Sequence, residues 1–335
     1  MKVAVIGAGS WGTALAKLLA EKNYPVTLWA YEPEVAEAVN TRHENPLYHP
    51  GIRLPENLTA TTDLAAAAAE QELALFVVPS HFMRDVLTQA APHLSPNVLA
   101  ASAAKGIENE TFLTMSGVMA EALPDHIASR MVAVSGPSFA REVIQGMPTA
   151  VSAASRDPLA ADAVQQALAT DYFRVYTSND VIGVELGGAV KNVIAIAAGI
   201  SDGMGFGTNT RAALITRGLA EIARLGVKMG ANPMTFAGLA GMGDLVLTCT
   251  GDLSRNRQVG LAIGQGKKLK EILAEMKQVA EGVKNAETVY KLSQKVGVEM
   301  PITEQVYLIL YADKTPAIAL ATLMGRKLKS EIELY

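Results

Sequence analysis

Two hydrophobic patterns alternate along the first half of the chain. Short apolar runs, which are typical of buried strands, are separated by stretches in which apolar residues recur with helical spacing. The runs that predict strands are residues 2–6, 26–29, 73–78, 98–101, 131–135, 149–153 and 173–176. Strands that alternate with helices predict an α/β fold with a parallel, doubly wound sheet, whose ligand crevice lies at the carboxyl ends of the strands.

This alternation stops after Asp180, and the rest of the chain predicts helices. A chain of 335 residues is long enough for two hydrophobic cores, because single cores rarely grow past about 250 to 300 residues. We therefore predict two domains, an α/β domain over residues 1–179 and an all-α domain over residues 180–335.

Lys191 lies in the middle of residues 184–199, an apolar stretch that predicts a helix. Its neighbours on the same helical face are small or apolar, so the lysine faces inward. These neighbours are Val184, Gly187, Gly188, Ile194, Ala195 and Ala198. The amine must either reach water along its stem or meet a partner, and partial desolvation would lower its pKa toward the range useful in proton transfer. Glycines at 187, 188 and 199 weaken a helix, which favours close approach by a ligand or another backbone.

The first predicted strand leads into a glycine-rich turn and then into a helix at residues 13–21. The turn reads Gly7-Ala8-Gly9-Ser10-Trp11-Gly12. This order is typical of the dinucleotide site of a Rossmann-type sheet, because the helix start presents N–H groups to phosphates. Gly7 permits the tight turn, Gly9 lets the backbone approach a pyrophosphate, and Gly12 allows the helix to pack on the sheet. The alternative is a glycine-rich turn without a ligand.

Cofactor choice is usually decided at the end of the second strand, which here reads Ala30, Tyr31 and Glu32. NAD-selective sites place an acidic residue there to bind the ribose hydroxyls. Ala30 occupies the most probable position for that residue, while Tyr31 can stack on adenine and Glu32 can reach the ribose. NAD and NADP both remain open.

Two further strand ends carry candidate chemistry. Lys105 follows the strand that ends near Ala101, and Gly136 and Ser138 follow the strand that ends at Ser135. A cation and a hydroxyl at these ends would lie beside the nicotinamide end of a bound cofactor. Both can also be ordinary loop residues.

The second half contains two polar clusters. Asp244 lies among apolar residues and therefore needs a partner, unless it caps the helix that follows Gly243. Ser254 is a candidate N-cap for a helix that begins with Arg255 and continues through Arg257. Helix amides and two arginines at one helix start predict an anion site, most naturally for phosphate, although a solvated basic turn is the alternative.

Composition excludes several classes of function. The net charge of −4 provides no attraction to nucleic acid or to anionic membranes. A single cysteine, Cys249, suits a reducing compartment. No segment offers about 18 uninterrupted apolar residues, no cluster has metal-ligand spacing, and no nucleophile elbow is present. We expect a cytoplasmic protein with no integral membrane segment, no metal and no nucleic-acid partner.

Taken together, these motifs resemble the bacterial NAD(P)-dependent glycerol-3-phosphate dehydrogenases, nearly from end to end. The matching blocks are Gly7 to Ala14, Pro79-Ser80, Lys105-Gly106, Ser135 to Ala140, Gly187 to Asn192, Gly241 to Leu245 and Ser254 to Asn256. One departure is Ala104, which precedes Lys105 where a threonine is more usual.

The resemblance implies reversible hydride transfer between dihydroxyacetone phosphate and sn-glycerol 3-phosphate, with NAD or NADP as cofactor. It also implies a helical domain like the C-terminal domain of 6-phosphogluconate dehydrogenase, a homodimer, and a product used in glycerophospholipid synthesis. By likeness, Lys191 is the catalytic acid and base. The implied substrate-binding residues are Lys105, Gly136, Ser138, Lys191, Asp244, Ser254, Arg255 and Asn256. The implied cofactor-binding residues are Gly7, Gly9, Ser10, Trp11, Gly12, Tyr31, Lys105, Ala140, Arg255, Val279 and Glu281.

Three rival functions remain at this point. The nearest is another dehydrogenase of the same two-domain plan, of the 3-hydroxyacid or phosphogluconate type. The others are a non-catalytic NAD(P)-sensing regulator and a structural helical protein with an incidental nucleotide fold.

Overall fold

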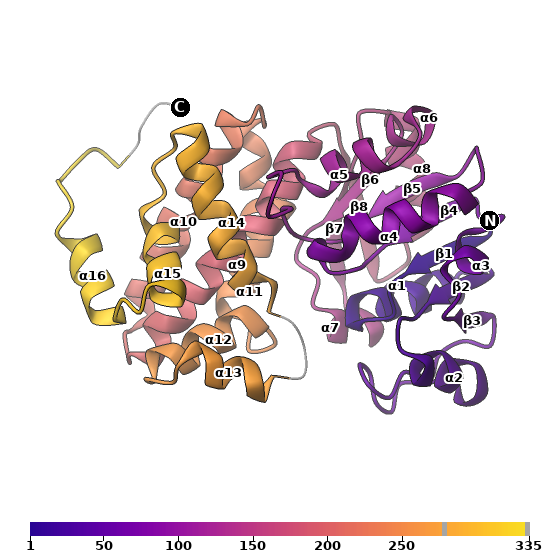
Figure 1. Cartoon of the computed structure of the whole chain (residues 1–335), viewed down its shortest axis with the longest axis horizontal. Helices are drawn as coiled ribbons and strands as arrows, with labels where there is room; N and C mark the ends of the chain where they lie inside the picture. The colour runs from indigo at the N-terminus through magenta and orange to yellow at the C-terminus, as the bar shows by residue number, and fades with distance from the viewer. Residues whose placement is uncertain (277–279, 332–335) are drawn as a thin grey trace. The chain divides into compact units, whose positions relative to one another are not determined.

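The computed structural model describes residues 1–276 and 280–331. The chain forms two compact units (Figure 1). Unit 1 comprises Met1–Glu108 and Leu113–Glu185, and unit 2 comprises Asn109–Phe112 and Leu186–Tyr335. Each unit is described by itself.

Unit 1 is built on a twisted sheet whose described part has eight strands in the order β3-β2-β1-β4-β5-β6-β7-β8. The strands are β1 (Val3–Ile6), β2 (Val26–Trp29), β3 (Leu58–Thr61), β4 (Leu73–Phe76), β5 (Leu99–Ser102), β6 (Val132–Ser135), β7 (Thr149–Ala154) and β8 (Phe173–Ser178). The central strands β1 and β4 are buried along their whole length, because helices cover both faces of the sheet. This is the doubly wound fold that the sequence predicts.

Two features of the sheet differ from the sequence prediction. β3 was not predicted, since its Leu-Thr-Ala-Thr sequence is short and buries only alternate residues at the sheet edge. β7 runs antiparallel to β6, with Ser135 paired to Ser152, so the sheet is mixed and not wholly parallel. An apolar run indicates a buried strand but carries no information on its direction.

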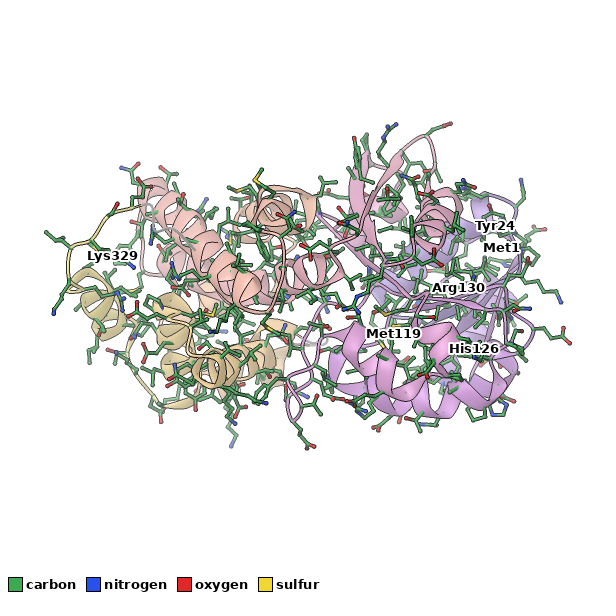
Figure 2. All side chains as sticks on the ribbon, turned by 90° about the horizontal axis from the view of Figure 1, so that it is seen from above. Met1, Tyr24, Met119, His126, Arg130 and Lys329 are labelled. Atoms are coloured by element: carbon green, nitrogen blue, oxygen red, sulfur yellow. The ribbon has the colours of Figure 1, made fainter. Side chains whose placement is uncertain are left out.

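Helices pack on the two faces of this sheet and form two cores. The helices are α1 (Ser10–Glu21), α2 (Pro33–Arg42), α3 (Leu64–Ala68), α4 (Met83–Ala90), α5 (Met115–Ala122), α6 (Asp125–Ala128), α7 (Ala140–Ile144) and α8 (Pro158–Leu168). α1 and α8 contribute to the core on one face, and α4 and α5 to the core on the other. Met119 of α5 belongs to the second core, whereas His126 and Arg130, also labelled in Figure 2, are exposed.

The described residues of unit 2 form helices joined by turns and loops, with no β-strand among them. Its helices are α9 (Val181–Gly203), α10 (Thr208–Lys228), α11 (Asp244–Thr250), α12 (Arg255–Gly264), α13 (Leu269–Glu275), α14 (Glu281–Val296), α15 (Pro301–Tyr311) and α16 (Pro316–Met324). α9 is long and apolar enough to cross a membrane, but 94% of its most apolar window is buried inside the protein. Such burial is typical of the central helix of a soluble core.

Glycines allow α9 and α12 to cross with their backbones in contact. A Cβ atom on Gly199 would lie 2.0 Å from the Arg257 carbonyl oxygen, and one on Gly260 would lie 2.1 Å from the Ile196 carbonyl oxygen. On the face that carries Lys191, a Cβ atom on Gly187 would lie 2.4 Å from the Ala240 carbonyl oxygen. Gly187 and Gly199 therefore permit the approach of another backbone, which was one of the two predicted reasons for them.

Candidate functional site

The Lys191 side chain lies in the interior of unit 2 and is bonded to two residues of α11. Its ammonium group donates a short hydrogen bond to the Asp244 carboxylate and a second bond of 2.8 Å to the Thr248 hydroxyl. Side-chain exposure is 7% for Lys191 and 1% for Asp244. The sequence left open whether the Lys191 amine reaches water along its stem or meets a partner. In the structure it meets a partner, Asp244.

A short π-helix, Leu239–Gly243, brings Asp244 to this position. It leads directly into α11, whose first residue is Asp244, and the glycine at 187 lets it pack against α9. Asp244 is therefore not a cap, because its carboxylate is directed at the lysine. The Thr248 hydroxyl also donates to the Asp244 carbonyl oxygen at 2.6 Å, which fixes the hydroxyl one turn further along α11.

Thr248 was not among the residues predicted for this site. A threonine four residues after a buried aspartate shares its helical face, and that spacing is the signal that could have found it. Thr248 is 4% exposed, and its hydroxyl oxygen accepts the bond from Lys191.

A second buried network joins α9, α12 and α14. The Asn256 side-chain amide donates to the Asn192 side-chain oxygen at 2.9 Å, and its own oxygen accepts from the Gly282 backbone amide at 2.9 Å. Asn192 follows Lys191 directly, so this network orients the segment of α9 that carries the lysine. Asn192 ends one of the blocks that match the dehydrogenase family, but no role was predicted for it.

The helix that starts after Ser254 has the predicted N-cap, but one of its two arginines is already in ion pairs with aspartates. The Ser254 side chain accepts a hydrogen bond from the Arg257 backbone amide at 3.2 Å. The Arg257 guanidinium is paired with Asp202 and Asp252, both at 2.8 Å. Arg255 is exposed, and its guanidinium forms no ion pair within residues 1–276 and 280–331. The prediction that both arginines serve one anion is therefore wrong for Arg257, whose charge is already balanced.

The glycine-rich turn of unit 1 has the geometry that a pyrophosphate requires. Gly7 has φ +122°, and a Cβ atom on Gly12 would lie 1.8 Å from the Gly7 carbonyl oxygen. A Cβ atom on Gly9 would meet no atom within 4 Å, so the space over the turn is open. Gly9 is also the N-cap of α1, and no side chain caps the helix. The open space and the uncapped helix start fit the phosphates of a dinucleotide.

Buried polar contacts hold this turn in place. The side-chain amide of Asn45 donates to the Ala8 carbonyl oxygen at 2.9 Å and to the Thr13 hydroxyl at 2.8 Å. Asn45 is fully buried and was not predicted. Ser10 and Trp11 begin α1, and the Trp11 ring packs 6.5 Å from the ring of Phe173.

Lys105, Gly136 and Ser138 lie together at the carboxyl ends of β5 and β6. The Lys105 ammonium group donates to the Gly136 carbonyl oxygen at 2.8 Å, and the Ser138 hydroxyl donates to the same oxygen at 2.9 Å. Gly136 has φ +147°, and a Cβ atom there would lie 2.8 Å from the Val151 Cα atom of β7. Glycine is therefore required where the chain turns away from β6.

The remaining predicted cofactor residues are distributed over both units. In unit 1, Tyr31 is 80% exposed at the end of β2, and Ala140 is the first residue of α7. In unit 2, Glu281 is the first residue of α14, and Val279 lies outside the described residues. Glu32, the alternative ribose partner, accepts a hydrogen bond from the Tyr48 hydroxyl at 3.1 Å.

Metal-ligating groups and the single cysteine are considered next. Within residues 1–276 and 280–331, no group of three or more His, Cys, Asp or Glu side chains is placed to hold a metal ion. Cys249 is buried beside Thr248, and burial raises the pKa of its thiol to about 12. The thiol therefore stays protonated at neutral pH and is not a nucleophile.

Comparison with known proteins gives matches to two profiles of one family, which together cover most of the chain. A family profile described as the N-terminus of NAD-dependent glycerol-3-phosphate dehydrogenase matches residues 2–161. A second profile, described as the C-terminus of the same enzyme, matches residues 180–321.

Individual relatives carry the same name. A protein of Citrifermentans bemidjiense named glycerol-3-phosphate dehydrogenase, NAD(P)+, is 61% identical over 330 residues, which is 98% of each chain. One of Syntrophobacter fumaroxidans with that name is 55% identical over 332 residues, covering 99% of this chain and 98% of the relative. The crystal structure of glycerol-3-phosphate dehydrogenase from Coxiella burnetii superposes with a TM-score of 0.92 at 43% identity, covering 97% of this chain and 99% of that one.

Proposed function

The chain belongs to the NAD-dependent glycerol-3-phosphate dehydrogenase family, and we propose that it interconverts dihydroxyacetone phosphate and sn-glycerol 3-phosphate with NAD or NADP. The observation that carries this proposal is the buried contact of Lys191 with Asp244 and Thr248. A sensor of NAD(P) needs no amine of this kind in a helical core, whereas a dehydrogenase needs a group that exchanges a proton with the substrate oxygen.

Lys191 is proposed as the acid and base for the C2 oxygen. On reduction of the ketone its ammonium group donates a proton to that oxygen, and on oxidation of the alcohol the neutral amine accepts it. The Asp244 carboxylate and the Thr248 hydroxyl direct the amine by their two hydrogen bonds. General acid–base catalysis by a positioned group typically contributes about 10² to 10⁴ in rate.

The substrate phosphate is proposed to bind at the start of α12. Ser254 caps that helix, and the exposed guanidinium of Arg255 lies at its first position. Amides of the first turn of a helix lack intrahelical partners and can bind an anion. Arg257 holds the helix through Asp202 and leaves Arg255 as the cation for the phosphate. Asn256 and Asp244 complete the proposed substrate set in unit 2.

In unit 1, the further substrate residues that we propose are Lys105, Gly136 and Ser138. They lie together, because the Lys105 ammonium group and the Ser138 hydroxyl both donate to the Gly136 carbonyl oxygen. The cofactor is proposed to bind over Gly7, Gly9 and Gly12. Its nicotinamide ring supplies or accepts the hydride when it is bound. The other proposed cofactor residues are Ser10, Trp11, Tyr31, Lys105, Ala140, Arg255, Val279 and Glu281.

We also propose a cytoplasmic homodimer whose product enters glycerophospholipid synthesis. A reducing compartment suits the single, buried Cys249. Light scattering of the purified protein tests the dimer, since a mass of one chain, 35.3 kDa, contradicts it.

Initial rates of NADH and NADPH oxidation test the proposed function. Dihydroxyacetone phosphate is compared with unphosphorylated dihydroxyacetone and with the 2-keto and 3-keto forms of common hydroxy acids. We expect turnover with the phosphorylated ketone alone. Preference for a keto acid would support another dehydrogenase of the same plan, and no turnover with any substrate would support a sensor of NAD(P).

A further inference from the structure

The loop that joins α2 to β3 is anchored on the glycine-rich turn of unit 1. Its residues 43–54 are here called the α2–β3 loop. The Asn45 side chain donates to the Ala8 carbonyl oxygen at 2.9 Å, and the His49 ring bonds to the Ser10 carbonyl oxygen at 2.8 Å. Both side chains are buried, so the loop has a fixed position beside the proposed pyrophosphate site.

The same loop holds the side chain of Glu32. The Tyr48 backbone amide donates to the Asn45 side-chain oxygen at 3.3 Å, and the Tyr48 hydroxyl donates to Glu32 Oε1 at 3.1 Å. Tyr48 also directly precedes His49. The carboxylate of Glu32 is therefore held by a residue that lies between two anchors, Asn45 and His49, which both bind the glycine-rich turn.

The backbone places Glu32 just after the carboxyl end of β2, next to the turn. β1 and β2 are neighbouring parallel strands in which Ile6 pairs with Trp29, and the Gly7 amide donates to the Trp29 carbonyl oxygen at 3.1 Å. Dinucleotide sites of this fold bind the hydroxyls of the adenosine ribose through an Asp or Glu about 20 residues after the turn. Glu32 has that spacing.

The Glu32 carboxylate is not used to cap α2. Glu32 is the N-cap residue, but its side chain makes no capping hydrogen bond, and Pro33 begins the helix. An ionised carboxylate has about four acceptor positions, of which the Tyr48 hydroxyl occupies one. The carboxylate can therefore accept a hydrogen bond from a ribose hydroxyl while Tyr48 holds it.

The charge at this end of β2 opposes a phosphate group. Residues 30–34 contain two carboxylates, Glu32 and Glu34, and no basic residue. Sites for NADP instead provide an arginine for the 2′-phosphate of the adenosine ribose. A 2′-phosphate in the place of the 2′-hydroxyl would lie against the Glu32 carboxylate, and the like charges would repel each other.

Arg53 and His49 of the α2–β3 loop do not reverse this charge. Arg53 pairs with Glu56 at 3.5 Å. Burial lowers the pKa of His49, and the charge of Arg141 on α7 lowers it as well, against the opposite effect of its bond to Ser10. The His49 ring is therefore uncharged at neutral pH, while the charge of Arg53 is balanced by a carboxylate.

We propose that Glu32 makes this protein selective for NAD and NADH over the phosphorylated cofactors, with Tyr48 as the residue that positions it. The Glu32 carboxylate accepts a hydrogen bond from the 2′-hydroxyl of the adenosine ribose and excludes a 2′-phosphate from the same place. This inference deepens the proposed function, because it rests on the proposed cofactor site over the glycine-rich turn.

Fluorescence titration of the wild-type protein with NADH and with NADPH measures this selectivity in the absence of substrate. We expect Kd to be at least about tenfold lower for NADH, which corresponds to one hydrogen bond to a charged group. Equal or tighter binding of NADPH would overturn the proposal. If Arg141→Ala then abolished that binding of NADPH, the 2′-phosphate would be assigned to Arg141 instead.

The variant Glu32→Gln removes the charge and keeps the shape of the side chain. We expect NADPH to bind more tightly than in the wild type and NADH less tightly, so that the ratio of the two Kd values approaches one. Glu34→Gln is the matched control, because it removes an equal charge from the exposed first turn of the same helix. A wild-type ratio in Glu32→Gln, or the same change of ratio in both variants, contradicts the proposal.

Tyr48→Phe tests the positioning role, because it removes only the hydroxyl that holds Glu32. The selectivity for NADH should fall about 2- to 10-fold, the range for one lost hydrogen bond. In the Glu32→Ala background the same change should leave the selectivity unaltered, since the carboxylate is absent, and additive effects would show that Tyr48 does not act through Glu32. Tyr24→Phe is the control, because Tyr24 precedes β2 and lies at the opposite end of that strand.

Failure of the proposed function is recognised separately from failure of this inference. Absence of turnover of dihydroxyacetone phosphate with either cofactor refutes the function, while the ratio of the two Kd values still tests Glu32. If neither nucleotide binds to the wild type, the cofactor site is refuted and this inference with it. The Tm of each variant verifies folding, which we expect to be retained because the Glu32 side chain caps no helix.

Discussion

The ammonium group of Lys191 and the carboxylate of Asp244 form an ion pair in the interior of unit 2. Removal of one member of a buried pair leaves the other charge without compensation, which typically costs about 3 to 5 kcal/mol. Lys191 and Asp244 thus contribute to stability as well as to the proposed chemistry, and experiments on them must separate the two contributions.

The variant Lys191→Met should bind NADH nearly as well as the wild type but lose turnover by at least about 10²-fold, because the proton donor is absent. Fluorescence titration and initial rates measure the two effects. The double variant with Asp244→Asn removes the uncompensated charge, so it should recover stability without recovering turnover. Retention of most of the wild-type kcat in Lys191→Met would refute the assignment.

Thr248→Val removes the hydroxyl that accepts from Lys191 while keeping the side-chain shape. We expect kcat to fall about tenfold, because one hydrogen bond to a charged group is worth about 1.5 to 3 kcal/mol and only part of it is used for orientation. Thr250→Val is the control on the same helix, since its hydroxyl bonds to the Val246 carbonyl oxygen instead. Equal effects of the two substitutions on kcat would contradict a specific role for Thr248.

Arg255→Ala and Arg257→Ala should have different consequences although both remove one arginine from α12. The first should raise KM for dihydroxyacetone phosphate by about 10- to 150-fold, equivalent to about 1.5 to 3 kcal/mol for a charge-assisted hydrogen bond. The second should lower Tm, because Asp252 loses its partner and buried Asp202 is left with Arg211 alone of its two arginine partners. An unchanged KM in Arg255→Ala argues against a phosphate site at this helix start.

Gly260→Ala should destabilise unit 2, because the added Cβ atom would lie 2.1 Å from the Ile196 carbonyl oxygen of α9. Overpacking of this kind typically costs about 1 to 3 kcal/mol. Gly207→Ala is the control, since a Cβ atom there meets nothing within 4 Å and the residue has φ −82°. Urea denaturation measures both, and equal stability of the two variants would mean that the helices move apart at little cost.

The buried carboxyl group of Glu221, in α10, should make the stability of the protein depend on pH. Its carboxylate accepts from the Ile302 and Thr303 amides at the start of α15, and burial raises its pKa to about 7. The pKa of this carboxyl group is 4.5 in the unfolded chain and about 7 in the folded protein. Between these two pH values the folded protein keeps the carboxyl proton while the unfolded chain has lost it. The free energy of unfolding therefore falls as the pH rises through this range.

The comparison with Glu221→Gln isolates this effect, since glutamine does not titrate. The free energy of unfolding of the wild type relative to the variant should fall by about 2 to 3 kcal/mol from pH 4.5 to pH 8. Urea denaturation at several pH values measures it. A wild-type profile parallel to that of Glu221→Gln would show that Glu221 ionises normally in the folded protein.

Local sequence patterns were sufficient for most elements of the fold. The strands of unit 1 are buried on both faces and appear as continuous apolar runs, and α9 is apolar enough to be recognised without its neighbours. The glycine turn could be predicted because its glycines are needed for the local backbone conformation. Gly7, for example, has φ +122°, which other residues rarely adopt. β3 was not predicted, because this edge strand buries only every second residue and so forms no continuous apolar run.

Contacts between distant segments required the tertiary structure. The sequence predicted that Lys191 faces inward and that Asp244 needs a partner, but only folding brought them together across 53 positions of the chain. In the folded chain Arg257, which the sequence had assigned to an anion site, also pairs with Asp202, and β7 runs antiparallel to β6. Neither feature could be predicted from the local sequence. Helical spacing and apolar runs reflect forces within one element, whereas ion pairs and strand direction depend on which elements meet.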